Sequence, residues 1–299
     1  MQEGRASRTA EYMALFRALE DARPPAQRLF DDPFARRFLS LPLRLVAALS
    51  RLPGVAGLVC RLIDRRWPGA RTSAVARTRR IDEQLAAAIA EGAEQMVLLG
   101  AGFDARAYRL PACRRLTVFE VDHPATLARK RALVARALRG LPGWVRFVAT
   151  DFDHANLASS LASAGYDPRR RTVFVWEGVT NYLTASAVDA TLRACARAVP
   201  GSLLVFTYVH RRVLDDPASF FGTTRLLATL AAAGERWTFG LDPARLADHL
   251  RERGLLLEED LGAAEYRARC YGPASTTMRG YEFYRIATAR VVAASGPAR

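Results

Sequence analysis

Residues 96–110, MVLLGAGFDARAYRL, decide the fold of this chain. The apolar run at their start stops at Gly100-Ala101-Gly102, and the acid Asp104 lies close behind this turn. A short apolar run that ends in glycines is typical of a buried parallel strand, and the missing side chains let a ligand touch the backbone. The stretch therefore predicts an α/β protein that binds a nucleotide-like cofactor at Gly100 and Gly102, with Asp104 beside it.

Further strands are expected along the chain. After about ninety residues that look helical, apolar runs of strand length alternate with helical stretches. Strands separated by helices imply right-handed crossovers and a doubly wound, mostly parallel, Rossmann-like sheet. We expect seven strands, at residues 97–99, 116–121, 145–149, 172–176, 203–208, 255–257 and 281–287.

Helices are expected to cover this sheet and its binding edge. An N-terminal helical cover, residues 1–92, should pack on a core of residues 93–299, and a helical insertion at about 211–253 falls between late strands, where it could roof the site. The apolar segment 41–63 has the pattern of two amphipathic helices joined at Pro53-Gly54. It is a packed cover, a mobile lid or a weak membrane contact, and its internal arginines argue against a spanning helix.

Composition restricts the partners of the protein. The net charge is +14, but Lys130 is the only lysine and the arginines are dispersed. A nucleic-acid surface would need clustered cations with aromatic side chains among them, so we expect no nucleic-acid partner. Four scattered cysteines without a CxxC pair predict neither a metal site nor disulfides and fit a reducing cytoplasm. The oligomeric state stays open, self-association included.

Acids follow most of the predicted strands, and ligands of such sheets bind beyond the carboxyl ends of the strands. Asp122 lies about twenty residues after the glycine turn, where an acid can accept hydrogen bonds from both ribose hydroxyls of an adenosine cofactor. Glu120 lies two residues earlier on the same strand, and we expect only one of the two to reach the ligand. Either acid could instead cap the helix that begins at Pro124.

The ends of the third and fourth strands carry two further acids. Asp151 could accept a hydrogen bond from the adenine amine while Phe152 packs on the ring, or it could cap a helix. Glu177 follows the fourth strand, where a buried carboxylate would suit a cationic ligand. Tyr182 could line the same pocket.

Two cofactor classes fit the glycine turn. Residues 100–105 match the G-x-G-x-x-G/A pattern, which serves NAD as well as S-adenosylmethionine. Asp104 would place a negative charge near a pyrophosphate, which is unfavourable, whereas a sulfonium with an ammonium group would tolerate it. The acid therefore favours S-adenosylmethionine.

Short motifs follow one another along nearly the whole chain. They are SRTA (7–10), DPFA (32–35), ARTRRID (76–82), LLGAGFDARAYRL (98–110), FEVDHP (119–124), ATDFD (149–153), WEGVTNYLT (176–184), EYRARCYGP (265–273) and YEFYRI (281–286). In order and spacing this set resembles the leucine carboxyl methyltransferase-like family, whose members are S-adenosylmethionine-dependent enzymes and include many bacterial proteins of unassigned substrate.

The resemblance implies roles for single residues. Arg77, with Arg8 as a second partner, would pair with the methionyl carboxylate of the cofactor. The remaining cofactor contacts that it implies are Gly100 at the turn, Asp122 on the ribose, Asp151 and Phe152 on the adenine, and Glu177 closing the site. Where the family usually has an arginine-tyrosine pair, this chain has Arg269-Cys270-Tyr271, which puts a role of that segment in the substrate pocket in doubt.

The implied reaction is attack of a substrate oxygen on the sulfonium methyl group. A carboxylate acceptor is already ionised and needs no base, but it needs a partner such as Tyr182, Arg77 or an arginine of the cover. A hydroxyl acceptor needs a base, for which His210 is the best placed histidine and His123 the second. We expect O-methylation of a small molecule, for example a secondary metabolite, at a carboxylate. Hydroxyl methylation, a nicotinamide-dependent oxidoreductase and a non-catalytic binding protein are the alternatives.

Overall fold

The apolar run before the glycine turn forms β1 (Gln95–Leu99), and all five of its residues are buried. The computed structural model describes residues 8–293, without the Arg8 side chain. In it, β1 pairs in parallel with β2 (Thr117–Asp122) on one side and β4 (Thr172–Trp176) on the other. β1 therefore lies inside the sheet, as a strand that is apolar at nearly every position requires.

The sheet has seven strands in the order β3-β2-β1-β4-β5-β7-β6. Among the described strands β7 alone runs in the opposite direction to the rest, so the predicted doubly wound, mostly parallel class is confirmed. The remaining strands are β3 (Val145–Ala149), β5 (Leu203–Val209), β6 (Leu255–Gly262) and β7 (Tyr284–Val291).

The last two strands differ from their predicted bounds. β6 extends to Gly262. The prediction stopped at residue 257 because the second half of the strand mixes polar and apolar residues and is not an apolar run. β7 begins at Tyr284 and not at residue 281, because residues 281–283 belong to the turn before it. Both strands lie at one side of the sheet, where a strand need not be apolar on both faces.

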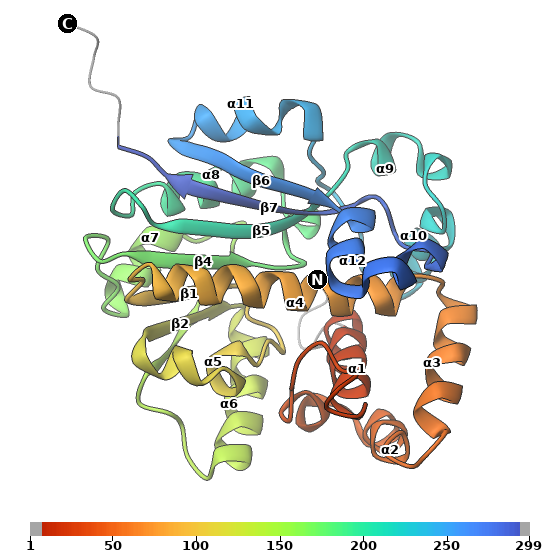
Figure 1. The fold of residues 1–299 in the computed structure, drawn as a ribbon. Coiled ribbons are helices and arrows are strands. Elements are labelled where there is room, and N and C mark those ends of the chain that lie inside the picture. Colours follow the sequence, from red (N-terminus) through yellow and green to blue (C-terminus); the bar gives the residue numbers. More distant parts are fainter. Residues whose placement is uncertain (1–7, 294–299) are drawn as a thin grey trace, which may run out of the picture.

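Helices cover both faces of the sheet (Figure 1). Successive residues of a strand point to opposite faces, so Met96 of β1 packs with Ile81 in one core cluster and Val97 packs with Val188 in the other. The first face carries α4 (Ala70–Ala90), α6 (Pro124–Leu138) and α12 (Ala263–Tyr271), and the second carries α7 (Leu157–Ser163), α8 (Ala185–Cys195) and α11 (Leu246–Arg251).

The N-terminal cover shares the core of the sheet. Its described part, residues 8–92, contains α1 (Arg8–Asp21), the 3₁₀ helix η1 (Ala35–Phe38), α2 (Leu41–Leu49), α3 (Val55–Arg66) and also α4. Leu19 and Phe38 belong to the same buried cluster as Met96, so the packing is continuous across residue 92. As predicted, the two apolar helices of the cover meet at Pro53-Gly54.

The insertion between β5 and β6 contains α9 (Arg212–Asp215), α10 (Thr223–Ala232) and α11. In Figure 1, α9 and α10 lie toward the same side of the molecule as α1–α3. The N-terminal cover and the insertion thus approach one end of the sheet from two sides. Within residues 8–293, no helix combines the length and the apolar character that crossing a bilayer requires.

Candidate functional site

The glycine turn after β1 is fixed by two close contacts. Gly100 has φ +68°, and a Cβ atom there would lie 2.3 Å from Cγ2 of Val179, in the loop after β4. The backbone N–H of Gly102 donates to Oδ2 of Asp122 at 2.6 Å. The positive φ and the close approach explain why position 100 is a glycine. As the sequence predicts, the loops after β1, β2 and β4 lie together.

Asp122 is the acid of β2 that reaches the strand end. Its Oδ1 accepts the backbone N–H of His123 at 2.7 Å, while the bond from Gly102 goes to the other oxygen. Burial raises the pKa of Asp122, and these two hydrogen bonds lower it, with burial the larger effect. Each carboxylate oxygen can accept more than one hydrogen bond, so the group can still bind a ribose. The cap of α6 is the His123 side chain, not an acid.

Glu120 does not reach this edge of the site. Its side chain is fully buried and forms an ion pair with Lys130, Nζ to Oε1 at 2.9 Å. Lys130 also donates to the backbone carbonyl of Ala101 at 3.1 Å. The only lysine of the chain therefore supports the glycine turn from the core. We assign Glu120 to this support and not to a cofactor contact.

Glu177, after β4, lies between two buried arginines. Its Oε1 accepts from Nε of Arg77 at 2.8 Å, and its Oε2 accepts from Nη1 of Arg106 at 2.7 Å. Burial raises the pKa of Glu177, but Arg106 and Arg77 together lower it below its ordinary value. The sequence predicts Glu177 and Arg77 at the site, and the structure brings them into contact. It does not predict Arg106, since no local pattern pairs residues 71 positions apart.

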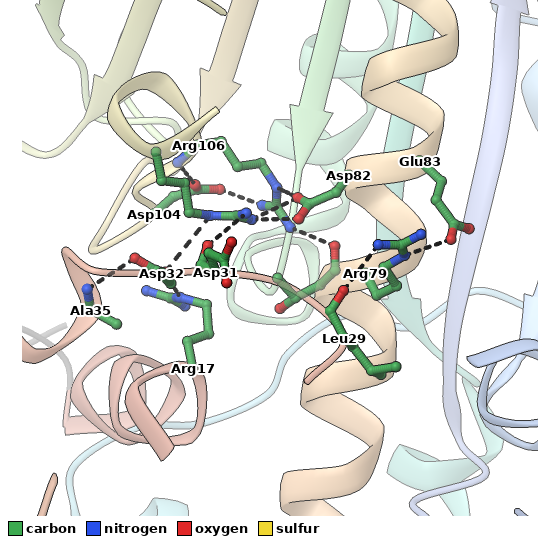
Figure 2. Close-up of polar contacts among 12 residues, drawn as sticks. Arg17, Leu29, Asp31, Asp32, Ala35, Arg79, Asp82, Glu83, Asp104 and Arg106 are labelled. Carbon is green, nitrogen blue, oxygen red and sulfur yellow. Dashed lines mark hydrogen bonds and ion pairs between the residues drawn. The ribbon is translucent and has the colours of Figure 1, made fainter. Parts of the chain in front are cut away.

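Arg106 belongs to a larger network of buried charges (Figure 2). Its guanidinium also pairs with Asp104 and, at 2.8 Å, with Asp82 of α4. Asp82 also pairs with Arg109 at 2.7 Å, and the Arg109 guanidinium lies 3.8 Å from the Asp32 carboxylate. Asp32 in turn pairs with Arg17 of α1 at 3.0 Å. Three of the sequence motifs, 32–35, 76–82 and 98–110, thus meet in one network that joins the cover to the cofactor turn.

Asp104 faces Arg106 within this network. Burial raises the pKa of Asp104, but Arg106, Lys130 and Arg17 lower it to about 2. The acid is therefore ionised at neutral pH, as its predicted role beside a cation requires. Its negative charge is already paired with Arg106 of the same chain.

This shift predicts a pH-dependent contribution of Asp104 to stability. Because the pKa is lower in the folded chain than the ordinary 3.8, the contribution is complete above that value and is lost as the pH falls through about 2. We expect wild type to exceed Asp104→Asn in free energy of unfolding by about 2 kcal/mol near neutral pH, and by about half of that near pH 3. Urea titrations of both proteins across this range measure it. A difference that does not change with pH contradicts the assignment.

Asp151 and Phe152 follow β3 in a turn. Oδ1 of Asp151 accepts the backbone N–H of Asp153 at 3.0 Å, and Phe152 packs partly buried against the core cluster of the second face. The cap of α7 is Asn156, so the helix-cap alternative for Asp151 is wrong. Contact of this pair with an adenine stays a prediction.

Tyr182 lies in the 3₁₀ helix η3 (Thr180–Tyr182), beside an acid that the sequence did not suggest. Its hydroxyl donates to Oε2 of Glu235 at 3.2 Å, and the Thr9 hydroxyl donates to the same oxygen at 2.6 Å. Burial and the charge of Glu235 raise the pKa of Tyr182 to about 12. Glu235 joins the insertion to α1 and to the loop after β4. Arg8 begins α1, but its side chain lies outside the described part of the chain.

His210 follows β5 and is half-buried. Its Nδ1 accepts the backbone N–H of Arg212 at 3.1 Å, and its ring lies 5.4 Å from that of Phe220. Burial lowers the pKa of His210. The neutral ring therefore carries its proton on Nε2, because Nδ1 is the acceptor.

The segment 269–271 supports α4. Arg269 pairs with Glu259 at 2.5 Å, and the Tyr271 hydroxyl donates to the carbonyl of Thr72 at 3.3 Å. Thr72 lies in the same helix as Arg77. This position explains the segment without a contact to a substrate.

The fold of this chain is the α/β fold of solved methyltransferase structures. A predicted methyltransferase from Thermobifida fusca of known crystal structure aligns with a TM-score of 0.57 at 17% identity, covering 92% of this chain and 97% of that one. A DUF574 family protein from Streptomyces avermitilis aligns with a TM-score of 0.55 at 14% identity, covering 92% and 96%. At these identities the likeness shows the fold alone.

The sequence comparisons establish the family. The family model of leucine carboxyl methyltransferase matches residues 10–196. Two predicted S-adenosyl-L-methionine-dependent methyltransferases from Frankia alni are 40% and 38% identical, covering 76% and 69% of this chain and 77% and 70% of their own. The chain therefore belongs to the leucine carboxyl methyltransferase family. The expected enzyme class, a methyltransferase that depends on S-adenosylmethionine, is confirmed.

Proposed function

We propose that this enzyme methylates an oxygen of a small molecule, and that the acceptor is a carboxylate. S-adenosylmethionine supplies a methyl group on a sulfonium, which is already activated for transfer. The protein therefore has to align the acceptor oxygen with the methyl group and exclude water, and such positioning contributes about 7–11 kcal/mol in favourable cases.

The residues at the strand ends fit this cofactor. Gly100 has no side chain at the turn, and Asp122 holds a carboxylate at the end of β2 for a ribose. Arg77 and Glu177, in contact at 2.8 Å, offer one charge of each sign. That pair would suit the carboxylate and the ammonium of a methionyl group, as the family resemblance implies. Asp151 and Phe152 are assigned to the adenine on the resemblance alone.

The hydrogen bond to Nδ1 of His210 is the observation that favours a carboxylate acceptor. A hydroxyl acceptor needs a general base, but Nδ1 of His210 already accepts a backbone N–H. Nδ1 of His123, the second candidate, likewise accepts the backbone N–H of Ala125. With their protons on Nε2, neither ring presents a free basic nitrogen. A carboxylate is ionised at neutral pH and does not need one.

A hydroxyl acceptor is the second candidate, and Glu235 is the observation that favours it. This carboxylate contacts the Tyr182 hydroxyl, so it could receive a proton there. The same contact argues against Tyr182 as the group that holds a substrate carboxylate, because the phenol already donates to an acid.

His210→Ala and Glu235→Gln together separate the two acceptors, since each removes one group that could receive a proton. With a carboxylate acceptor we expect kcat to change by less than about threefold in both variants, since no base is lost, whereas loss of a general base would lower it by about 10²–10⁴. The assay uses labelled S-adenosylmethionine with a panel of small carboxylic acids and phenols. Alkaline treatment then releases the label from methyl esters but not from ethers. Alkali-stable product, or a large loss of kcat in either variant, contradicts the carboxylate proposal.

The partners and the compartment of the enzyme are proposals too. We propose a small-molecule acceptor, no nucleic-acid partner and a reducing cytoplasm as the compartment. The last rests on the four cysteines, which are free thiols, two of them buried.

A further inference from the structure

The hairpin of α2 and α3, residues 41–66, turns leucines toward solvent. Six of its leucines are between 51% and 69% exposed: Leu41, Leu45, Leu49, Leu52, Leu58 and Leu62. Of the eleven large apolar side chains that are exposed in residues 8–293, these six fall within 22 positions of the sequence. Single exposed apolar residues are ordinary, but a group of this kind marks a site of interaction. We refer to residues 41–66 as the leucine hairpin.

Both helices of the leucine hairpin carry the same pattern. Leu41-Pro-Leu-Arg-Leu45 in α2 and Leu58-Val-Cys-Arg-Leu62 in α3 each place an arginine three residues after one leucine and directly before the next. Positions i, i+3 and i+4 share one face of a helix. In α3 these side chains, with Asp64 and Arg65, line a pocket on the surface. Each helix thus presents a mixed stripe of leucine and arginine.

The inner side of the hairpin already accounts for its attachment. Val46 and Ala47 of α2 and Val59 and Ile63 of α3 pack against the core cluster of the first face. The exposed leucines lie on the other side, and α3 has no fully buried residue. A helix that is apolar on both sides is normally buried on both, so the exposed side of this one lacks a packing partner. The outer stripe is therefore not needed to hold the hairpin on the protein.

The charge around the stripe is almost all positive. The hairpin contains five arginines and one acid, the arginines being Arg44, Arg51, Arg61, Arg65 and Arg66. That acid, Asp64, pairs with Arg71 of α4 at 2.7 Å, and Arg51 pairs with Asp21 of α1 at 3.0 Å, which leaves four arginines for a partner. Trp67 follows α3, with the Arg66 guanidinium 4.9 Å from its ring centre. Tryptophan and arginine next to apolar side chains are common where a protein meets the head groups of a bilayer.

We propose that the leucine hairpin docks on membranes that contain anionic lipids, lying in the interface and not crossing it. Leucines would enter the boundary between head groups and acyl chains while the arginines contact lipid phosphates. A second copy of the chain fits the same surface less well. A two-fold dimer sets the same patch against itself, which would bring the arginines of both copies together.

Sedimentation with vesicles tests this proposal. The full chain is mixed with vesicles of phosphatidylcholine containing phosphatidylglycerol, or of phosphatidylcholine alone, and the pelleted fraction is measured at rising salt. We expect binding to the anionic vesicles that weakens with salt. The double variant Leu58→Ser/Leu62→Ser should bind the anionic vesicles at least about tenfold more weakly than wild type. Leu256→Ser is the matched control, since Leu256 is as exposed as Leu58, at 51%, but lies on β6.

Charge variants and two structural readouts complete the test. Arg61→Gln/Arg65→Gln should weaken binding and flatten its salt dependence, whereas Arg212→Gln/Arg251→Gln, exposed elsewhere, should do neither. All variants should keep the wild-type Tm and affinity for S-adenosylmethionine. The proposal is overturned if wild type does not bind anionic vesicles, or if the leucine variant binds as wild type does. It is also overturned if sedimentation velocity shows a dimer that the leucine variant abolishes.

Discussion

Arg106→Ala should lower the free energy of unfolding by about 3–5 kcal/mol. The Arg106 side chain is only 2% exposed and contacts Glu177, Asp82 and Asp104. These contacts raise the pKa of Arg106 well above its ordinary value, although burial alone would lower it. Removal of the guanidinium leaves acids of three separate segments without their shared counter-charge, and buried charges without a partner are costly. Urea unfolding followed by tryptophan fluorescence measures the change.

Arg79→Ala is the control for this measurement. Arg79 lies in α4, but its side chain is 45% exposed, pairs with Glu83 one helical turn away and donates to the Leu29 carbonyl at 3.0 Å. An exposed pair of this kind contributes about 0.3–0.5 kcal/mol and a hydrogen bond about 0.5–1.5 kcal/mol, so Arg79→Ala should cost less than about 2 kcal/mol. Arg106→Lys keeps the charge but loses the forked geometry, so it should fall between wild type and Arg106→Ala. If Arg106→Ala costs no more than Arg79→Ala, the network does not hold the cover on the core.

Gly100→Ala should weaken the binding of S-adenosylmethionine by more than about 100-fold. A side chain at φ +68° is strained, and its Cβ would lie 2.3 Å from the Val179 side chain. Left-handed backbone costs about 1–2 kcal/mol and overpacking about 1–3 kcal/mol. Relief of either requires the turn or the loop after β4 to move, and both loops form the proposed site. Calorimetric titration with the cofactor measures the loss.

Two further variants separate the close contact from the backbone strain. Gly165 has φ +87°, nothing lies within 4 Å of the position that its Cβ atom would take, and it follows α7, away from the site. Gly165→Ala should therefore lower stability but leave affinity unchanged. Gly100→Ala/Val179→Ala removes the contact and should recover part of the affinity. Wild-type affinity in Gly100→Ala would show that the turn does not hold the cofactor.

Much of the fold could be predicted because its strands differ sharply from their surroundings. β1 and β4 are buried at every position, so their apolar runs stand out between helices. β6 is different, since half-exposed acids interrupt it. Its length is set by pairing with β7, which no local pattern contains. The joint of α2 and α3 was predictable because Pro53-Gly54 interrupts two helical repeats.

The candidate site was predictable where it depends on topology and not where it depends on pairing. Parallel strands end at the same edge of a sheet, so Asp122 and Glu177 had to lie near the glycine turn. The partners of these acids come from distant segments. Arg106 meets Glu177 across 71 positions, and Tyr182 meets Glu235 across 53. Glu120 and Asp122 are two residues apart and so share a face of β2, and the alternation of the strand does not separate them. Their positions along the strand do, because Asp122 ends it beside the glycine turn and Glu120 lies inside the core against Lys130.

Calorimetric titration of wild type and Asp122→Ala with S-adenosylmethionine tests most directly whether the cofactor binds at the strand ends. We predict one site per chain in wild type, no heat with NADH, and a loss of about 1–3 kcal/mol in the variant, since a charge-assisted hydrogen bond to the ribose is lost. That loss is a factor of roughly 5–150 in Kd. Equal affinity of both proteins for S-adenosylmethionine would contradict the site, and binding of NADH by wild type would contradict the cofactor.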